Sequence, residues 1–82
     1  MIEFRPIKVA TGSADTEGRL VMHRGLLVAV VVQLADPSHG DDCGRWYLEA
    51  RFGGVDVIGS PLFDDLDEAG AWLGERLLRA PV

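Results

Sequence analysis

The sequence predicts an α+β fold, in which an antiparallel sheet of four to five strands forms a β-meander and one C-terminal helix packs on one face. Short apolar runs with the alternation of strands fill residues 2–60, and segments rich in Gly, Pro and Asp separate them. The long stretch with helical periodicity follows at residues 65–80. With 82 residues, the chain has room for a single small domain, 1–82, built around one core.

The first strand is expected at residues 2–9. Phe4 falls on one face of this strand and Ile7 on the other, so the alternation breaks between them. Pro6 lies at the break and has no N–H to donate to a neighbouring strand, which predicts an edge strand with a bulge. The small polar residues 11–18 that follow are expected to form a loop.

Residues 19–34 form the most hydrophobic part of the chain. They fit either one long strand that bends at Gly25 or two strands, 19–23 and 26–34, joined by a hairpin or sharp bulge at Arg24 and Gly25; we favour the second arrangement. The strand at 26–34 is apolar on both faces, which is typical of a central strand. One face would carry Leu26, Val28, Val30, Val32 and Leu34, and the other Leu27, Ala29, Val31 and Gln33.

A clear alternation predicts the next strand at residues 46–52. Its inward set is large and apolar: Trp46, Leu48, Ala50 and Phe52. Gly53 and Gly54 then predict a two-residue hairpin turn. A last strand is expected at residues 55–60, and Pro61 ends its pairing.

The helix expected at residues 65–80 has matching signals at its start and along one face. Asp64 or Asp65 provides the N-terminal cap, and with Asp65 in that place Glu68 lies three residues on, as in a capping box. One stripe has the spacing of a helix face buried on a sheet: Leu66, Ala69, Leu73, Leu77 and Ala80.

Two glycines, Gly70 and Gly74, interrupt this helix, and each costs about 1 kcal/mol relative to Ala in a helix interior. At about 100° per residue, both fall on one flank of the buried stripe. Because glycine has no Cβ, this flank predicts a close-packing edge that another backbone approaches, either the sheet of the same chain or a partner. Trp72 lies on the opposite flank, where Arg76 can reach over its ring.

A single helix covers one face of the sheet and leaves the other face without a lid. On that other face the central strand offers Leu27, Ala29 and Val31. Because an uncovered apolar face favours association over contact with water, we expect a homodimer or another protein partner there. The alternative is that the N-terminal segment folds back over this face.

Composition narrows the choice of partners and of cellular location. The formal net charge is -5 and most acidic residues lie in residues 36–82, so nucleic acid and anionic membranes are not expected partners. Cys43 is the only cysteine, so no intrachain disulfide is expected. No apolar run approaches the roughly 20 residues of a membrane-spanning helix, and the first residues lack a secretory signal, so we expect a cytoplasmic protein.

The loop expected at residues 35–45 gathers oxygen, nitrogen and sulfur atoms that could hold a metal ion. They belong to Asp36, His39, Asp41, Asp42 and Cys43. Their spacing matches no metal motif, and Pro, Ser, Gly and Asp also form turns, so we favour a solvated connection and expect no cofactor. No Ser, Cys or carboxylate has the spacing of a nucleophile–base pair with a histidine, so no catalytic residue is assigned.

The segment RWYLEARFGG followed by PLFDDLDEAGAWLGERL resembles the strand–turn–strand–helix ending of the arm-type DNA-binding domains of phage integrases. It is also similar to HicB-type antitoxins, in which a Phe-x-x-Leu-x-Glu-Ala pattern precedes a helix on a short sheet. The resemblance to integrase arms implies DNA binding through basic strand faces. In this chain, Glu49 and Asp56 accompany Arg45 and Arg51 on the corresponding hairpin.

These observations lead to three hypotheses on function, of which a metal-dependent or enzymatic role centred on residues 36–43 is the least favoured. The first is a small, non-catalytic, cytoplasmic module of bacterial type that self-associates or binds another protein through its apolar sheet face. The alternative is a nucleic-acid-binding or regulatory domain that uses the basic N-terminal half, with Arg5, Lys8, Arg19 and Arg24 on one surface.

Overall fold

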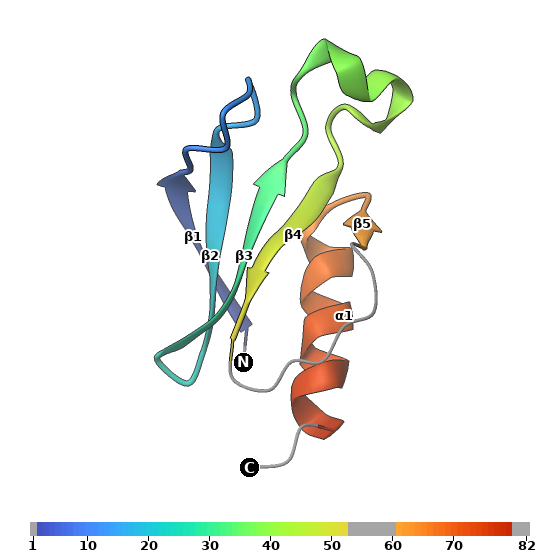
Figure 1. The fold of residues 1–82 in the computed structure, drawn as a ribbon. Coiled ribbons are helices and arrows are strands. Elements are labelled where there is room, and N and C mark those ends of the chain that lie inside the picture. Colours follow the sequence, from blue (N-terminus) through green and yellow to red (C-terminus); the bar gives the residue numbers. More distant parts are fainter. Residues whose placement is uncertain (1, 53–60, 80–82) are drawn as a thin grey trace.

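The structure, a computed structural model, describes residues 2–52 and 61–79. Within these residues, the strands form one five-stranded antiparallel sheet in the order β1-β2-β3-β4-β5, and an α-helix follows the last strand. This arrangement confirms the predicted α+β meander with its C-terminal helix (Figure 1). The elements are β1 (Ile2–Lys8), β2 (Glu17–His23), β3 (Leu26–Gln33), β4 (Trp46–Arg51), β5 (Leu62–Phe63) and α1 (Leu66–Arg79).

A two-residue turn at Arg24 and Gly25 joins β2 to β3. Both residues have positive φ, 53° and 79°, as in the hairpin turns whose twist matches that of the flanking strands. Gly25 adopts this conformation without steric cost because it lacks a Cβ. The structure therefore confirms a hairpin here rather than one long bent strand.

β1 lies at the edge of the sheet, as predicted, but it has no bulge at Pro6. It pairs residue by residue with β2, from Ile2 opposite His23 to Lys8 opposite Glu17. An edge strand leaves one side of its backbone unpaired, so the missing N–H of a proline fits without a shift in register. The predicted bulge is wrong, and the register shifts lie instead between β2 and β3 and between β3 and β4.

The second register shift changes which way the side chains of β4 point. Ala50 pairs with Val30 and Leu48 with the next residue of β3, which leaves Glu49 as an extra residue between them. The alternation with inward apolar side chains holds up to Leu48. Beyond Leu48 the predicted alternation is wrong, because Ala50 points to the same face of the sheet as its partner Val30 and Phe52 is 49% exposed.

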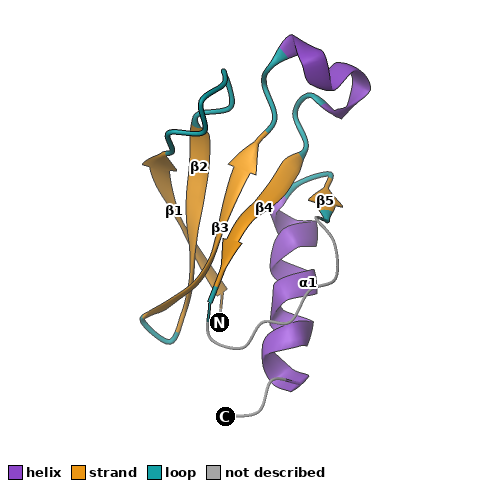
Figure 2. Ribbon diagram, viewed as in Figure 1, coloured by secondary structure: helices purple, strands orange, loops and turns teal. Residues whose placement is uncertain are grey.

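The hydrophobic core lies between α1 and one face of the sheet. Figure 2 shows α1 running alongside the strands near β4 and β5. On the helix, Ala69 and Leu73 have no exposed surface, and the rings of Trp72 and Phe63 lie with their centres 5.5 Å apart. The sheet contributes Val21, Val28, Ala29, Val31, Trp46, Leu48 and Phe63 to this core.

Two of the three residues expected on the uncovered face belong to the core instead. Ala29 and Val31 have no exposed surface and lie in one cluster with Leu73 of α1. Leu27 pairs with Met22 and is 38% exposed. The prediction is wrong for Ala29 and Val31 because both side-chain sets of this strand are apolar, so alternation alone cannot tell which set the helix covers.

A short strand that the sequence did not predict, β5, pairs with β4, and in it Phe63 lies opposite Trp46. Residues 53–60, with the predicted glycine turn and strand, lie outside the described residues.

The connection at residues 35–45 contains a short 3-10 helix, η1 (Pro37–Asp42). Asp36 caps it, because its Oδ1 accepts a hydrogen bond from Ser38 N at 3.0 Å. Proline at the first position of a helix needs no N–H partner, which favours the start at Pro37. A local signal for a helix start was therefore present in this predicted loop.

α1 begins with the predicted cap. Asp65 Oδ1 accepts a hydrogen bond from Glu68 N at 2.8 Å, and Glu68 Oε2 accepts one from Asp64 N at 3.3 Å. The reciprocal bonds of a capping box are thus shared between the two aspartates. One turn before the end of the described helix, the Arg76 guanidinium carbon lies 4.1 Å from the centre of the Trp72 ring, as expected.

The two glycines of α1 have different surroundings. A Cβ on Gly70 would lie 3.3 Å from Phe4 Cζ, so this position packs closely on the sheet of the same chain. No atom of the described residues lies within 4 Å of a Cβ placed on Gly74. The close-packing edge is therefore limited to Gly70, because Gly74 lies one turn further along, beyond the reach of Phe4.

Candidate functional site

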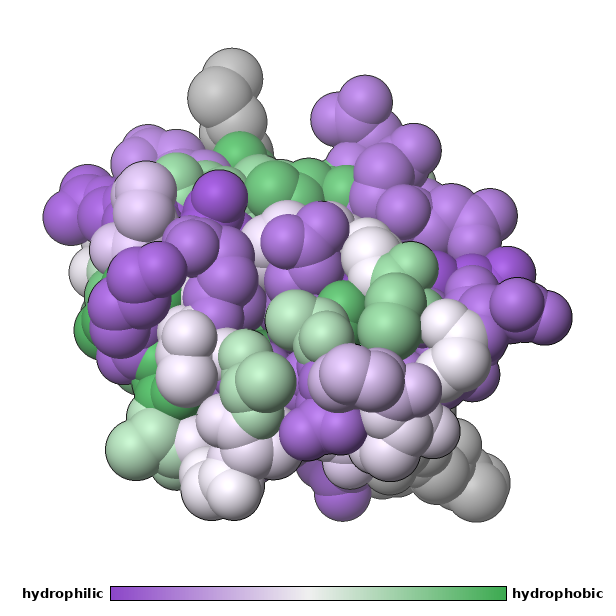
Figure 3. Space-filling model, turned by 90° about the horizontal axis from the view of Figure 1, so that it is seen from above, coloured by the Kyte–Doolittle hydropathy of each residue, from purple (hydrophilic) through white to green (hydrophobic). Residues whose placement is uncertain are grey.

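The face of the sheet opposite α1, which we call the open face, has two distinct halves. Near the β2–β3 turn it presents hydrophobic side chains, which we call the apolar patch: Leu20, Met22, Leu27, Val30 and Ala50. At the other end, between the β1–β2 connection and η1, it is hollowed into a pocket. Seen from this loop end, the surface is mixed, with small hydrophobic areas among hydrophilic side chains (Figure 3).

The strand register places the apolar patch on the open face. Leu20 and Met22 alternate with Arg19 and Val21, and Val21 is a core residue. The Arg19 guanidinium carbon lies 5.2 Å from the centre of the buried Trp46 ring, also on the core side. Leu20 and Met22 therefore point to the open face. The residues opposite them on β3, Val30 and Leu27, point to the same face.

The members of the apolar patch are only partly covered. Leu27 is 38% exposed and the other four are half-buried. On the adjoining edge strand, Arg5 lies opposite Leu20 and Glu3 opposite Met22, and the side chains of Arg5 and Glu3 approach to 3.6 Å. The patch is thus apolar in its middle and bordered by charge along β1.

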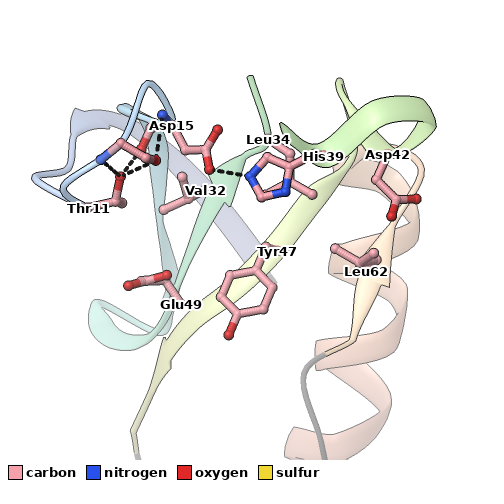
Figure 4. Close-up of a pocket in the computed structure, with 10 residues that line it drawn as sticks. Thr11, Asp15, Val32, Leu34, His39, Asp42, Tyr47, Glu49 and Leu62 are labelled. Atoms are coloured by element: carbon pink, nitrogen blue, oxygen red, sulfur yellow. Dashed lines mark hydrogen bonds and ion pairs between the residues drawn. The ribbon is translucent and has the colours of Figure 1, made fainter. Parts of the chain in front are cut away.

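The pocket at the loop end has a volume of about 400 Å³ (Figure 4). Residues of β3 and β4 form its base, and its two walls come from the β1–β2 connection and from η1. The residues that line it are Thr11, Ser13, Asp15, Val32, Leu34, His39, Asp42, Tyr47, Glu49 and Leu62.

Asp15 ties the two walls of the pocket together. Its Oδ1 accepts hydrogen bonds from Ala35 N at 2.5 Å and from Asp36 N at 2.7 Å, and its Oδ2 lies 2.6 Å from His39 Nε2. An ionised carboxylate only accepts, so Nε2 is the nitrogen of His39 that carries the proton in this pair. We call this set of contacts the Asp15 clamp; Figure 4 shows the side chains of Asp15 and His39 joined to each other above Tyr47 and Glu49.

The clamp holds Asp15 in its ionised form although the residue is only 7% exposed. The hydrogen bond from the Ala35 backbone is the largest influence, followed by burial, which opposes it, and by the bonds from Asp36 and His39. Together they hold the pKa of Asp15 well below the ordinary range of an aspartate. No local sequence signal marks this residue, because its partners lie 20 or more positions away in the chain.

Local contacts shape the wall that carries Asp15. Thr11 Oγ1 donates a hydrogen bond to Asp15 O at 2.8 Å, and Asp15 N donates one to Ser13 Oγ at 3.1 Å. At the foot of this wall, a Cβ on Gly18 would come within 2.6 Å of Val9 Cγ2, so only glycine lets Val9 lie over this position.

The five residues that suggested a metal site do not converge. Asp36 caps η1, Cys43 Sγ donates to the Asp36 carbonyl at 3.3 Å, and Asp42 Oδ1 lies 3.4 Å from Arg45 Nη1. The histidine is engaged by the Asp15 clamp, and Asp41 is exposed. Among the residues that the structure describes, no three His, Cys, Asp or Glu side chains gather in a way that could hold a metal ion.

The basic residues of the N-terminal half do not form a common surface. Lys8 Nζ lies 2.7 Å from Glu17 Oε1 and Arg19 Nη1 lies 2.7 Å from Glu17 Oε2. The hydrogen bond from Lys8 has the largest effect in lowering the pKa of Glu17, and the hydrogen bond from Arg19 lowers it further. Because Arg19 faces the core side and Arg5 the open face, the placement gives no support to the nucleic-acid alternative.

Comparison with known proteins assigns neither a family nor a function to this chain. No protein-family model, curated protein or solved structure matches this chain. Within residues 2–52 and 61–79, no helix has the length and apolar character needed to cross a membrane.

Proposed function

We propose that this chain is a small, non-catalytic, cytoplasmic interaction module that self-associates as a homodimer through the apolar patch. The observation that carries the proposal is a row of five hydrophobic side chains on the open face, with α1 on the opposite face and the pocket walls confined to the loop end. Removing such a surface from water favours association, because burial of apolar area is the main driving force of most protein contacts.

A second copy of the chain is the partner that this surface fits best. A two-fold axis brings the same patch of two copies together, so the patch alone supplies both halves of the interface. Pairing through the edge of the sheet is disfavoured, since β1 carries Pro6 and the exposed charges of Glu3, Arg5 and Lys8. The contact is therefore expected face to face.

Sedimentation velocity at tens of micromolar protein tests this proposal. We expect the unaltered chain to sediment as a dimer, and Leu27→Lys and Val30→Asp to sediment as monomers, because each variant places a charge in the interface. The matched control is Ala71→Asp, which adds a charge at an exposed position of α1 on the other side of the molecule and should leave the dimer intact.

Circular dichroism verifies that each variant stays folded. Because Leu27 is already 38% exposed, Leu27→Lys should fold normally even where Val30→Asp does not. A monomeric unaltered chain, or a folded Leu27→Lys variant that still dimerises as tightly, would contradict the proposal.

A further inference from the structure

We infer that the pocket at the loop end of the open face binds a small organic cation with an apolar body, of the class of alkyl and arylalkyl amines. This site lies apart from the apolar patch and does not depend on self-association. Three features of the pocket carry the inference: its size and rigidity, the apolar residues of its base, and the charges of the side chains that line it.

The pocket is large enough for a small molecule and is formed before one arrives. Its volume of about 400 Å³ lies within the range of roughly 300–1,000 Å³ that small-molecule sites occupy. The Asp15 clamp joins the wall from the β1–β2 connection to the wall from η1 through three hydrogen bonds. A site held in this way loses little conformational freedom on binding, which favours affinity for a weakly interacting ligand.

The base of the pocket suits an apolar body. Val32 and Leu34 are buried beneath it, and Leu62 borders it. Tyr47 and Glu49 both project from β4 onto this side of the sheet (Figure 4). A hydrocarbon chain or ring can therefore rest on the aliphatic side chains while a cationic group lies near the face of the Tyr47 ring, where cations are attracted.

The charged side chains that line the pocket favour a cation. None of the residues that line the pocket in the described part of the chain is Lys or Arg. Asp15 is engaged by the clamp and Asp42 by Arg45, whereas Glu49 forms no ion pair with any described residue. Glu49 is therefore the carboxylate that an ammonium group would pair with, and an anionic ligand would meet three negative charges.

Ordinary strand alternation places Glu49 on the same side of β4 as Tyr47, because the two residues are two positions apart. The register shift, with Glu49 as the extra residue, turns Ala50 to this side as well, opposite Val30. Tyr47, Glu49 and Ala50 therefore all face away from the core.

Titration of the ¹⁵N-labelled protein with benzylamine, followed by amide chemical shifts, tests the inference. Benzylamine is cationic at neutral pH and carries an apolar ring. We expect saturable shifts at Tyr47, Glu49 and Leu62, with a dissociation constant on the order of 1 mM for a ligand of this size. Benzoate, of similar shape and opposite charge, should produce no saturable shifts at these residues.

Two substitutions separate a specific site from general attraction to an acidic protein. Glu49→Gln keeps the shape of the side chain and should weaken benzylamine binding about threefold to fivefold, as for a partly exposed ion pair. Glu75→Gln removes the same charge from an exposed position on α1 and should leave the affinity unchanged.

Repeating the titration on Leu27→Lys, the variant that is expected to be monomeric, tests ligand binding separately from dimerisation. Binding of benzylamine by this variant supports the pocket whatever its oligomeric state. The inference is overturned if benzoate binds as well as benzylamine, if Glu49→Gln binds with unchanged affinity, or if the shifts do not centre on the pocket.

Discussion

On the face of the sheet beneath α1, Val21 and Val31 have no exposed surface, whereas on the open face their neighbours Leu20 and Val30 remain half-buried. Both sets of side chains are aliphatic and belong to the same two strands. The difference therefore does not come from the residues themselves but from what lies over them. One α-helix of 14 residues covers one face, and the described residues contain no second α-helix to cover the other.

The loop end of the open face is held together by polar contacts rather than by an apolar layer. At its loop end, the carboxylate of Asp15 binds two backbone N–H groups and His39, and this joins two connections that lie far apart in the sequence. Buried hydrogen bonds to a charged group are strong and directional, so they fix the geometry of a pocket that hydrophobic packing would fill. One face thus supplies stability, and the other supplies surfaces available for binding.

The largest expected effect comes from weakening the helix-covered face. Leu73→Ala removes a side chain with no exposed surface and should lower the free energy of unfolding by about 2–5 kcal/mol, measured by urea denaturation with tryptophan fluorescence. Leu26→Ala makes the same chemical change at a position that is 69% exposed and should cost less than about 0.5 kcal/mol. Similar losses for the two variants would show that α1 does not form the main cover of the sheet.

A smaller effect is expected from breaking the Asp15 clamp. Asp15→Asn keeps the size of the side chain but removes the negative charge and half of the acceptor capacity that the clamp uses. The melting temperature should fall by roughly 5 °C or more. Asp41→Asn, at an exposed position of η1, serves as the control and should melt like the unaltered chain.

The clamp also predicts a dependence on pH. Because the pKa of Asp15 in the folded chain lies well below the ordinary value near 3.9, its stabilisation is complete above that value and is lost as the pH falls through the folded pKa. The stability difference between the unaltered chain and Asp15→Asn should therefore shrink on acidification below about pH 4. Glu17, whose pKa is also lowered, is present in both proteins and cancels in this comparison. Asp36 cancels only in part, because the Asp15 charge, which opposes the lowering of the Asp36 pKa, is absent from the variant. A difference that stays constant down to pH 2 would contradict the role of the carboxylate.

The elements of the covered face were predictable because their signals are local. The spacing of Leu66, Ala69 and Leu73 defines the helix stripe, and Arg24 and Gly25 define the hairpin turn. Which face of β3 the helix covers was not predictable, since both of its side-chain sets are apolar and the choice depends on contacts between distant segments.

The pocket was less accessible to sequence reasoning than the fold. Alternation places Glu49 beside Tyr47 on the outward side of β4, but it does not show that two connections form walls there. Those walls are held together by Asp15, whose partners lie 20 or more residues away. The loop at residues 35–45 carries residues of the types that bind metals, but their main contacts are caps and ion pairs rather than a shared site.

The smallest expected effect separates the two glycines of α1, which the same substitution probes in two environments. Gly74→Ala should raise the free energy of unfolding by about 0.5–1 kcal/mol, because it adds helix propensity where no described atom lies within 4 Å of the new Cβ. Gly70→Ala adds the same propensity, but its Cβ would come 3.3 Å from the Phe4 ring, so displacement of that ring should cancel most of the gain. Urea denaturation of the two variants side by side measures this difference. Equal gains would mean that β1 yields easily and that Gly70 is not required for close packing, whereas a loss at Gly74 would indicate a contact with residues outside the described part of the chain.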